Sequence, residues 1–183
     1  MTNCIVELLM QPTYTPIAID GCYRLDASHF VDKRGSFGRL YTPSWLPADF
    51  SIVQSNYSLN PLTSTFRGFH GTSDNSETKI IYLISGSITG CIFSKTSKSY
   101  LEYNLSVDTS PVGVLLAPDT LHAFLTRKPN TNLVYMTNSI FNPATYVKYS
   151  YLSPSFSISE SVLNSIVHIS DTDRLAPFFS HDQ

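Results

Sequence analysis

The sequence predicts an all-β domain, and three observations support this prediction. Ser and Thr are abundant, with 26 and 17 copies among 183 residues, whereas charged residues make up only 14%. Hydroxyl residues suit strands and turns. Hydrophobic residues reach 42%, which is enough for a sizeable core. Short apolar runs separated by turn residues recur about every eight to twelve positions, as in sandwiches and barrels. The length predicts one domain spanning residues 1–183.

Nine runs between Ile17 and Phe141 are predicted strands, because β-branched and aromatic residues dominate them. The segment around Gly86 is predicted to be a tight hairpin, since Gly accepts a positive φ between two apolar runs. This number of strands indicates a closed or a double-sheet barrel. The predicted strands are residues 17–25, 36–42, 51–59, 79–84, 87–94, 100–107, 112–117, 123–126 and 132–141.

Helices are predicted only as accessories. One turn is expected within residues 43–50, around Trp45, and a short helix over residues 159–167 with Ser159 as its cap. Residues from about 150 to 183 are expected to fold back as a cover over the barrel, and residues from about 1 to 31 to form an amino-terminal arm. The apolar face of the second helix would consist of Val162, Leu163, Ile166 and Val167.

Charge and hydropathy exclude several classes of protein. The net charge is −2 and the basic residues are scattered, so the basic stripe of a nucleic-acid-binding protein is missing. No apolar run approaches the roughly 18 residues of a membrane span, and the sequence lacks a secretory leader pattern. We therefore expect a soluble cytoplasmic protein. Cys4, Cys22 and Cys91 lack metal-site spacing, which favours three buried thiols over a metal-binding or nucleophilic role.

The string Arg67-Gly68-Phe69-His70-Gly71 is the most unusual in the chain, because it places a cation and an imidazole three residues apart. On this string alone, a hydrogen-bonded core histidine is the more common interpretation of His70, because a His among aromatics is more often part of a core. Lys79 heads a very apolar run, and strand alternation places its side chain on the same face as Ile81 and Leu83. A lysine that points into a barrel is costly unless it serves an anion.

Seven short motifs in a fixed order, spread over residues 17–178, identify a resemblance to a known family. They are Asp32-Lys33-Arg34-Gly35-Ser36-Phe37; Gln54-Ser55-Asn56-Tyr57-Ser58; Arg67-Gly68-Phe69-His70; Lys79 with Gly86; Pro118 with His122 and Phe124; Tyr135; and Ile169-Ser170-Asp171-Thr172-Asp173 with Pro177. Together they resemble the dTDP-4-dehydrorhamnose 3,5-epimerase family. The resemblance implies a cupin-type jelly-roll β-barrel with a short accessory helix near its carboxyl terminus.

The resemblance implies a catalytic role for four residues. A hydrogen next to a ketone is lost at neutral pH only if a base is in place and the enolate oxygen is stabilised. His70 would be the base, Asp173 would fix its tautomer, and Lys79 would neutralise the enolate. Tyr135 would return a proton from the opposite face. Considered alone, Tyr135 is also compatible with an ordinary barrel aromatic, since the chain contains 11 Tyr.

The resemblance also implies a substrate-binding set. Arg34 and Arg67 would clamp a pyrophosphate, and His122 would contact the pocket or a phosphate. Gln54, Asn56 and Arg39 would complete the set. We expect no metal, because His70 lacks the second His and the Glu of metal-binding cupins.

Two departures from the family fall in the expected nucleotide-base pocket. Arg39 stands where family members usually have Glu, and Ser36 stands where they have an aromatic. An Arg can donate hydrogen bonds to guanine or cytosine, so we predict that a GDP- or CDP-linked substrate is handled at least as well as a dTDP-linked one.

The leading hypothesis is therefore a cofactor-free isomerase, an epimerase of a nucleotide-linked 4-keto-6-deoxy sugar that acts as a homodimer. In the dimer, Arg34 would serve the neighbouring subunit. Two alternatives remain: a 3,4-ketoisomerase built on the same barrel, and a nucleotide-sugar-binding barrel without turnover.

Overall fold

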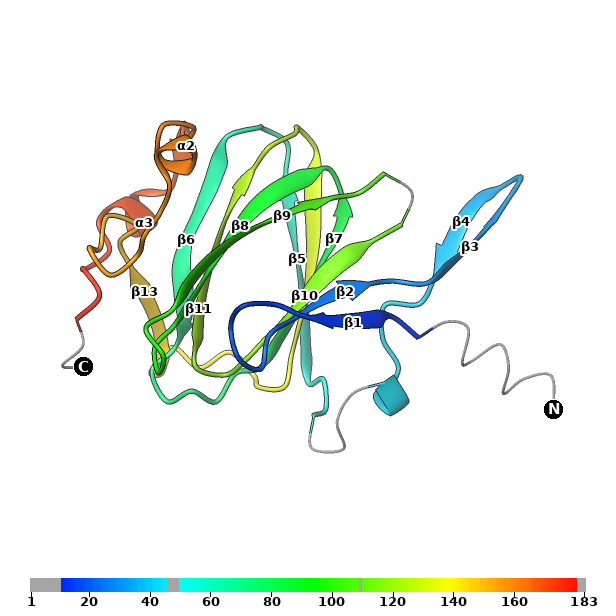
Figure 1. Cartoon of the computed structure of the whole chain (residues 1–183), viewed down its shortest axis with the longest axis horizontal. Coiled ribbons are helices and arrows are strands. Elements are labelled where there is room, and N and C mark those ends of the chain that lie inside the picture. The colour runs from blue at the N-terminus through cyan, green and yellow to red at the C-terminus, as the bar shows by residue number, and fades with distance from the viewer. Residues whose placement is uncertain (1–10, 46–49, 109, 181–183) are drawn as a thin grey trace.

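The computed structural model describes residues 11–45, 50–108 and 110–180, and two facing sheets dominate it (Figure 1). Neither sheet closes into a barrel within this part of the chain, so the double-sheet jelly roll is the correct form of the predicted all-β fold. The first sheet has the order β1 (Thr13–Pro16), β2 (Tyr23–Asp26), β10 (Val112–Leu116), β7 (Lys79–Ser85), β12 (Thr131–Thr137) and β5 (Gln54–Asn60). The second has the order β13 (Tyr146–Tyr149), β6 (Thr65–Thr72), β11 (Thr120–Thr126), β8 (Ser87–Ser94) and β9 (Tyr100–Ser106), with β14 (His168–Ile169) also beside β6.

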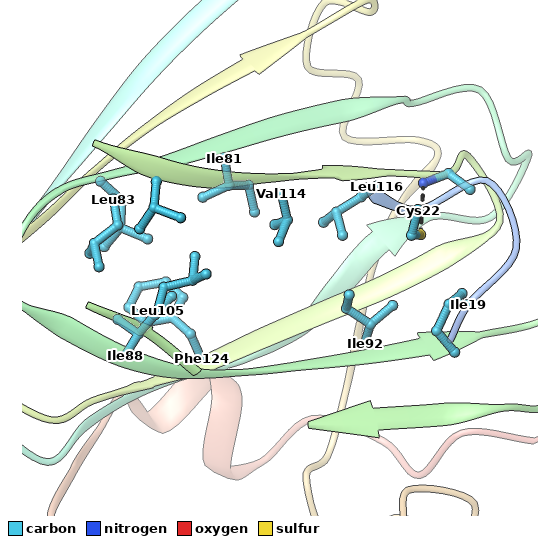
Figure 2. Close-up of a cluster of buried hydrophobic side chains, with 13 residues drawn as sticks. Ile19, Cys22, Ile81, Leu83, Ile88, Ile92, Leu105, Val114, Leu116 and Phe124 are labelled. Carbon is cyan, nitrogen blue, oxygen red and sulfur yellow. Dashed lines mark hydrogen bonds between the residues drawn. The ribbon is translucent and has the colours of Figure 1, made fainter. Parts of the chain in front are cut away.

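The main core fills the space between the two sheets (Figure 2). Ile81 and Val114 of the first sheet face Ile88, Leu105 and Phe124 of the second, and all five are almost completely buried. Burial of a side chain of this size contributes about 1.5–3 kcal/mol. This core fixes the separation of the sheets, and therefore the width of any pocket between them.

Both outer faces are covered as well, which explains the continuous apolar run of β7. Leu40, Tyr41 and Ile52 pack against Ile80 and Tyr82 on the outside of the first sheet. Strands that are buried on both faces lose the apolar–polar alternation of half-exposed strands.

On the second sheet, the carboxyl-terminal segment supplies the cover. The Phe156 ring lies 4.1 Å from that of Phe69 and 5.0 Å from that of Phe93, measured between ring centroids. Val162 of helix α2 (Glu160–Leu163) packs into the same cluster. The last part of the described chain is therefore anchored to the outside of the second sheet.

The predicted strands from residue 79 to residue 117 are confirmed to within a few residues. The predicted hairpin around Gly86 is wrong, because β7 and β8 do not pair and belong to different sheets. Gly86 instead makes the turn from one sheet to the other, with φ +87°, and a Cβ there would lie 2.2 Å from Thr131 Oγ1. The predicted strand 123–126 begins earlier, at Thr120.

Other predicted boundaries are wrong for identifiable reasons. Residues 17–25 are not one strand, because a turn at Gly21, with φ +71°, separates β1 from β2. Predicted strand 36–42 is only β4 (Gly35–Gly38), predicted strand 51–59 begins at Gln54, and predicted strand 132–141 ends at Thr137. Strands β6 and β13 were not predicted at all, because their pairing depends on partners that are distant in the sequence.

The short helices agree in part with the expectation. Residues 43–50 contribute the 3-10 helix η1 (Pro43–Trp45), and residues 46–49 lie outside the described part. Ser159 caps α2 by accepting a hydrogen bond from Val162 N at 3.3 Å, as predicted. A further helix, α3 (Asp171–Arg174), was not predicted. None of the described helices has the length and hydrophobicity to cross a membrane.

Two of the three cysteines fall within the described residues, and both are buried thiols as predicted. Burial raises the pKa of Cys22 to about 11 and that of Cys91 to about 12. Cys4 lies outside the described residues.

A separate ribbon, the β3–β4 hairpin, projects away from the two sheets (Figure 1). It consists of β3 (His29–Asp32) and β4, and its Phe30, Val31 and Phe37 side chains are exposed by 48%, 68% and 69%. A two-stranded ribbon is marginally stable by itself in water. Its exposed apolar side chains are therefore free to pack against another molecule.

Gly90→Ala is expected to destabilise the protein by about 1–3 kcal/mol through overpacking. Gly90 pairs with Tyr103 across β8 and β9, and a Cβ at Gly90 would lie 2.2 Å from Cζ of that ring. Urea unfolding measures the decrease in the free energy of unfolding. In the double variant Gly90→Ala/Tyr103→Val the ring is absent, so we expect a smaller loss than the sum of the single variants. Strict additivity would contradict this explanation.

Candidate active site

A pocket of about 440 Å³ is walled by both sheets and by α3. Four elements supply the predicted catalytic residues: His70 from β6, Lys79 from β7, Tyr135 from β12 and Asp173 from α3. Three cations (Arg67, Lys79 and Lys148) and two carboxylates (Glu77 and Asp173) line it, which gives an excess of one positive charge when His70 is neutral. Such a pocket suits an anionic ligand.

A β-bulge brings Arg67 and His70 to the same face of β6. Residues three apart on a regular strand point to opposite faces. Here His70 pairs with His122 of β11, whereas Arg67 pairs with Phe124, so three steps on β6 correspond to two steps on β11. The bulge turns both side chains inward, and Phe66 and Phe69 pack into the outer cluster.

The imidazole of His70 is held as a neutral base. Its Nδ1 lies 3.0 Å from the Gly68 carbonyl oxygen, and since a carbonyl can only accept, Nδ1 carries the hydrogen. The Nε2 lone pair is then available toward the pocket. Burial and the nearby Lys79 lower the pKa of His70 to about 3, so the ring is unprotonated at neutral pH.

Asp173 does not make the contact that the sequence analysis assigned to it. Its Oδ2 accepts from Gly68 N at 3.2 Å, and its Oδ1 accepts from Lys148 Nζ at 2.9 Å. The tautomer of His70 is set by the Gly68 carbonyl instead. A Cβ at Gly68 would lie 3.1 Å from that of Asp173, so a side chain there would push Asp173 away by a few tenths of an ångström. Despite its burial, the pKa of Asp173 is below the usual value, because Lys148 and the Gly68 amide stabilise the carboxylate.

Lys79 lies on the inner face as predicted, and it has a carboxylate partner. Its side chain is 10% exposed, and Nζ lies 2.8 Å from Glu77 Oε2. The pair explains how an ammonium group is tolerated at this depth. Glu77 lies in the loop that leads into β7, two residues before Lys79.

Tyr135 faces the pocket from the sheet opposite to that of His70. Its strand β12 lies between β5 and β7, where Tyr135 pairs with Asn56 and Ile81. Burial raises the pKa of the phenol, so it stays protonated across the neutral range. Tyr135 can therefore donate a proton.

The predicted binding residues fall into two groups. Gln54, Asn56 and Arg67 line the pocket, and Arg67 Nε donates to Asn60 Oδ1 at 2.9 Å. The others lie away from the pocket lining. His122 is buried behind it, with Nε2 2.7 Å from the Tyr103 hydroxyl; Arg34 pairs with Asp32 on the β3–β4 hairpin; and Arg39 stacks over Trp45 with its guanidinium carbon 5.9 Å from the ring centroid.

Five further pocket residues belong to none of the sequence motifs: Glu77, Thr137, Phe141, Tyr146 and Lys148. Tyr146 and Lys148 alternate along β13 with Val147 and Tyr149, which pack into the outer cluster. The alternation along β13 is visible in the sequence, but this segment lacks the apolar run from which the other strands were predicted. In the part of the chain that the structure describes, no group of three or more His, Cys, Asp or Glu has the arrangement of a metal site.

Lowering the pH from about 7 to about 4.5 is expected to reduce the free energy of unfolding. Folding depresses the pKa of both His70 and His122 through burial, so below about pH 6.5 the unfolded chain binds protons that the folded chain excludes. Each histidine can contribute at most about 1.4 kcal/mol per pH unit in this window.

Urea unfolding at stepped pH measures this effect. Asp173, whose pKa is depressed below its usual acidic value, affects stability only at lower pH. The variant His122→Gln should show a shallower decline than the unmodified chain. Equal slopes would mean that His122 is not held neutral by the fold.

Comparison with known proteins gives a consistent result. The family model described as dTDP-4-dehydrorhamnose 3,5-epimerase matches residues 16–181. No sequence among the curated proteins matches the chain.

Several solved structures have the same fold. The dTDP-4-dehydrorhamnose 3,5-epimerase of Bacillus anthracis, solved with TDP and PPi bound, is 23% identical with a TM-score of 0.81, over 92% of this chain and 99% of that one. NovW of Streptomyces spheroides, a 4-keto-6-deoxy sugar epimerase, is 19% identical with a TM-score of 0.79, over 92% and 87%. ChmJ of Streptomyces bikiniensis, a 3'-monoepimerase solved with dTDP-quinovose, is 21% identical with a TM-score of 0.76, over 89% and 86%.

Proposed function

Because the chain belongs to the dTDP-4-dehydrorhamnose 3,5-epimerase family, we propose that it inverts carbon 3, carbon 5 or both in a nucleotide-linked 4-keto-6-deoxy sugar. His70 removes a proton next to the ketone through its Nε2 lone pair. Lys79 stabilises the negative charge that develops on the keto oxygen. Tyr135 returns a proton to the other face of the same carbon. Since side chains supply the base, the acid and the cation, the proposed reaction needs no cofactor.

One observation supports this function above the others: His70 and Tyr135 lie on opposite sheets of the same pocket. Inversion requires removal from one face of a carbon and return to the other. A base and an acid on opposite walls meet that requirement for a sugar ring bound between them. The neutral imidazole and the protonated phenol are in the protonation states that the two steps need.

The experiment is incubation with dTDP-, GDP- and CDP-linked 4-keto-6-deoxy sugars in deuterated water, followed by NMR. We expect deuterium at carbon 3 or carbon 5 together with an inverted product. Migration of the carbonyl group to carbon 3 would instead identify a 3,4-ketoisomerase. Binding without any exchange would identify a barrel without turnover.

The three nucleotides also test the prediction about the base. Arg39 and Ser36 replace the acidic and aromatic residues usual in the family, so we propose that GDP or CDP binds at least as tightly as dTDP. Calorimetric titration with the three diphosphates measures this preference. Clearly tightest binding of dTDP would mean that other residues recognise thymine.

We further propose that the active form is a homodimer in which the β3–β4 hairpin lies against the neighbouring subunit. The hairpin carries Arg34 and Ser36 and exposes Phe30, Val31 and Phe37. Arg34 is highly exposed, with 84% of its side chain accessible, and its only ion-pair partner among the described residues is Asp32 of the same ribbon. A neighbouring pocket would give this cation an anionic ligand.

Light scattering at micromolar concentration is expected to give a mass twice the 20.4 kDa of the chain. Phe37→Asp should shift the mass toward the monomer and reduce activity, because a charge would be buried against the partner. Ser97→Ala, on an exposed turn, serves as the control. A fully active monomer would contradict the proposed dimer.

A further inference from the structure

Lys148 is a pocket cation that the proposed reaction does not use. It lies on β13 directly opposite His70 in the strand register. Its Nζ donates to Asp173 Oδ1 at 2.9 Å and to Thr172 Oγ1 at 3.3 Å. Lys148, Arg67 and Asp173 also border a second cavity, of about 600 Å³. Lys148 therefore stands at the boundary between two cavities, on a long side chain that is 34% exposed.

On the side of β6 that pairs with β13 and β14, a gap between these two partner strands places Asp173 beside His70. We call it the gap in the edge of β6. Strand β13 pairs with β6 from Phe69 to Thr72, and β14 pairs with it at Thr65 and Phe66. Between these two partners, Gly68 turns its amide to Asp173 and its carbonyl to His70 Nδ1. Only the Gly68 peptide thus separates the carboxylate from the imidazole, and none of the hydrogen bonds of Asp173 among the described residues goes to His70.

The charges around His70 come from every neighbouring element. Lys79 of β7 and Lys148 of β13 lower its pKa, whereas the Gly68 carbonyl and Asp173 of α3 raise it. The rings of Tyr146 and His122 lie 6.0 and 6.3 Å away, measured between centroids. Among the described residues, Asp173 is the carboxylate that raises the pKa of His70, and its ion pair with Lys148 offsets this effect. Burial is the largest cause of the low pKa of His70, and together with this offset it makes His70 a weak base in the free protein.

We propose that Lys148 is a positioning residue. In the free protein its ion pair holds Asp173 away from His70. When an anionic nucleoside diphosphate binds, Lys148 pairs with the diphosphate instead, and Asp173 becomes free to contact the imidazole. The first half of this proposal is the ion pair in the free protein, and the second half is the release of Asp173 by the nucleotide. The second half rests on the function proposed above. A diphosphate carries more negative charge than a carboxylate and competes for the ammonium group. Asp173 keeps its bond to the Gly68 amide through Oδ2, and Oδ1, which Lys148 now occupies, becomes available to the imidazole. The base then gains strength only when the substrate is bound.

The first half is tested without substrate, by NMR of the His70 imidazole in the free protein. Lys148→Met should raise the pKa of His70 by about one unit or more, since it removes a cation and frees a carboxylate. At about pH 5 the protonated fraction of His70 then rises about tenfold. Lys148→Gln is a second variant in case the first folds poorly. Lys148→Arg and Thr172→Val keep the charge pair and should leave the pKa unchanged. An unchanged pKa in folded Lys148→Met or Lys148→Gln would overturn the proposal.

The second half is tested with dTDP, GDP and CDP, using whichever binds by calorimetry. Bound nucleotide should raise the pKa of His70 in the unmodified chain and change it much less in Lys148→Met. An unchanged pKa in the nucleotide-bound unmodified chain would overturn the release step. Absence of turnover with all three sugars, together with the expected pKa changes, would count against the proposed function and not against the role of Lys148.

Discussion

His70→Asn is expected to abolish deuterium uptake at the carbon next to the ketone, lowering the rate by about 10²–10⁴. The asparagine amide can still donate to the Gly68 carbonyl, which now accepts from His70 Nδ1 at 3.0 Å. What it cannot supply is a basic lone pair toward the pocket. His70→Ala should lose the reaction to the same extent, because it removes the base as well. NMR in deuterated water, with the nucleotide-linked keto sugar in excess, measures the exchange.

The control for this experiment is His168→Asn, an exposed histidine on β14. It should exchange deuterium at the rate of the unmodified chain. Circular dichroism and urea unfolding establish that the variants stay folded. Wild-type uptake in folded His70→Asn would remove His70 from the role of base.

Tyr135→Phe is expected to separate the two halves of the reaction. The first proton should still be removed, because His70 and Lys79 are untouched, but formation of the inverted product should fall by about 10²–10⁴ for lack of the acid. The substitution removes only the hydroxyl, so packing against the inner core is kept. The measurement compares exchange at the carbon with the yield of inverted sugar in the same sample.

Tyr149→Phe is the matched control, since this tyrosine belongs to the outer cluster and not to the pocket. It should change neither exchange nor inversion. Equal loss of exchange and inversion in Tyr135→Phe would mean that Tyr135 supports the structure of the site and does not donate the proton.

The parts of the fold that local pattern determines were predictable. Strands β7 and β8 follow from their apolar runs and from the turn at Gly86. Strand β6 could not be found in this way, because Gly68 and Gly71 weaken the local strand signal. Both glycines are needed for close approach, and a Cβ at Gly71 would lie 2.8 Å from the Thr120 carbonyl oxygen. Pairing with β11 and β13 forms this strand, against its local preference.

The features of the site divide in the same way, into those that follow from local pattern and those that follow from non-local pairing. Alternation along β7 correctly placed Lys79 on the inner face. The common direction of Arg67 and His70 depends on a bulge that only the register with β11 defines. The partner of Asp173 is Lys148, which belongs to none of the sequence motifs. Residue identities could thus be read from the motifs, whereas their pairing depended on non-local geometry.

The gap in the edge of β6 has a consequence for the order in which the site forms during protein synthesis. Asp173 fills that gap from 105 residues further along the chain than Gly68. At about 5–20 residues per second, a ribosome delivers that carboxylate about 5–20 s after the strand that carries His70. All strands of the two sheets from β1 to β13 are synthesised before that carboxylate, and β14 and α3 dock against β6 after them. The growing chain therefore acquires this site carboxylate only after the main strands of both sheets, and a product truncated before residue 170 would have those strands but lack that carboxylate.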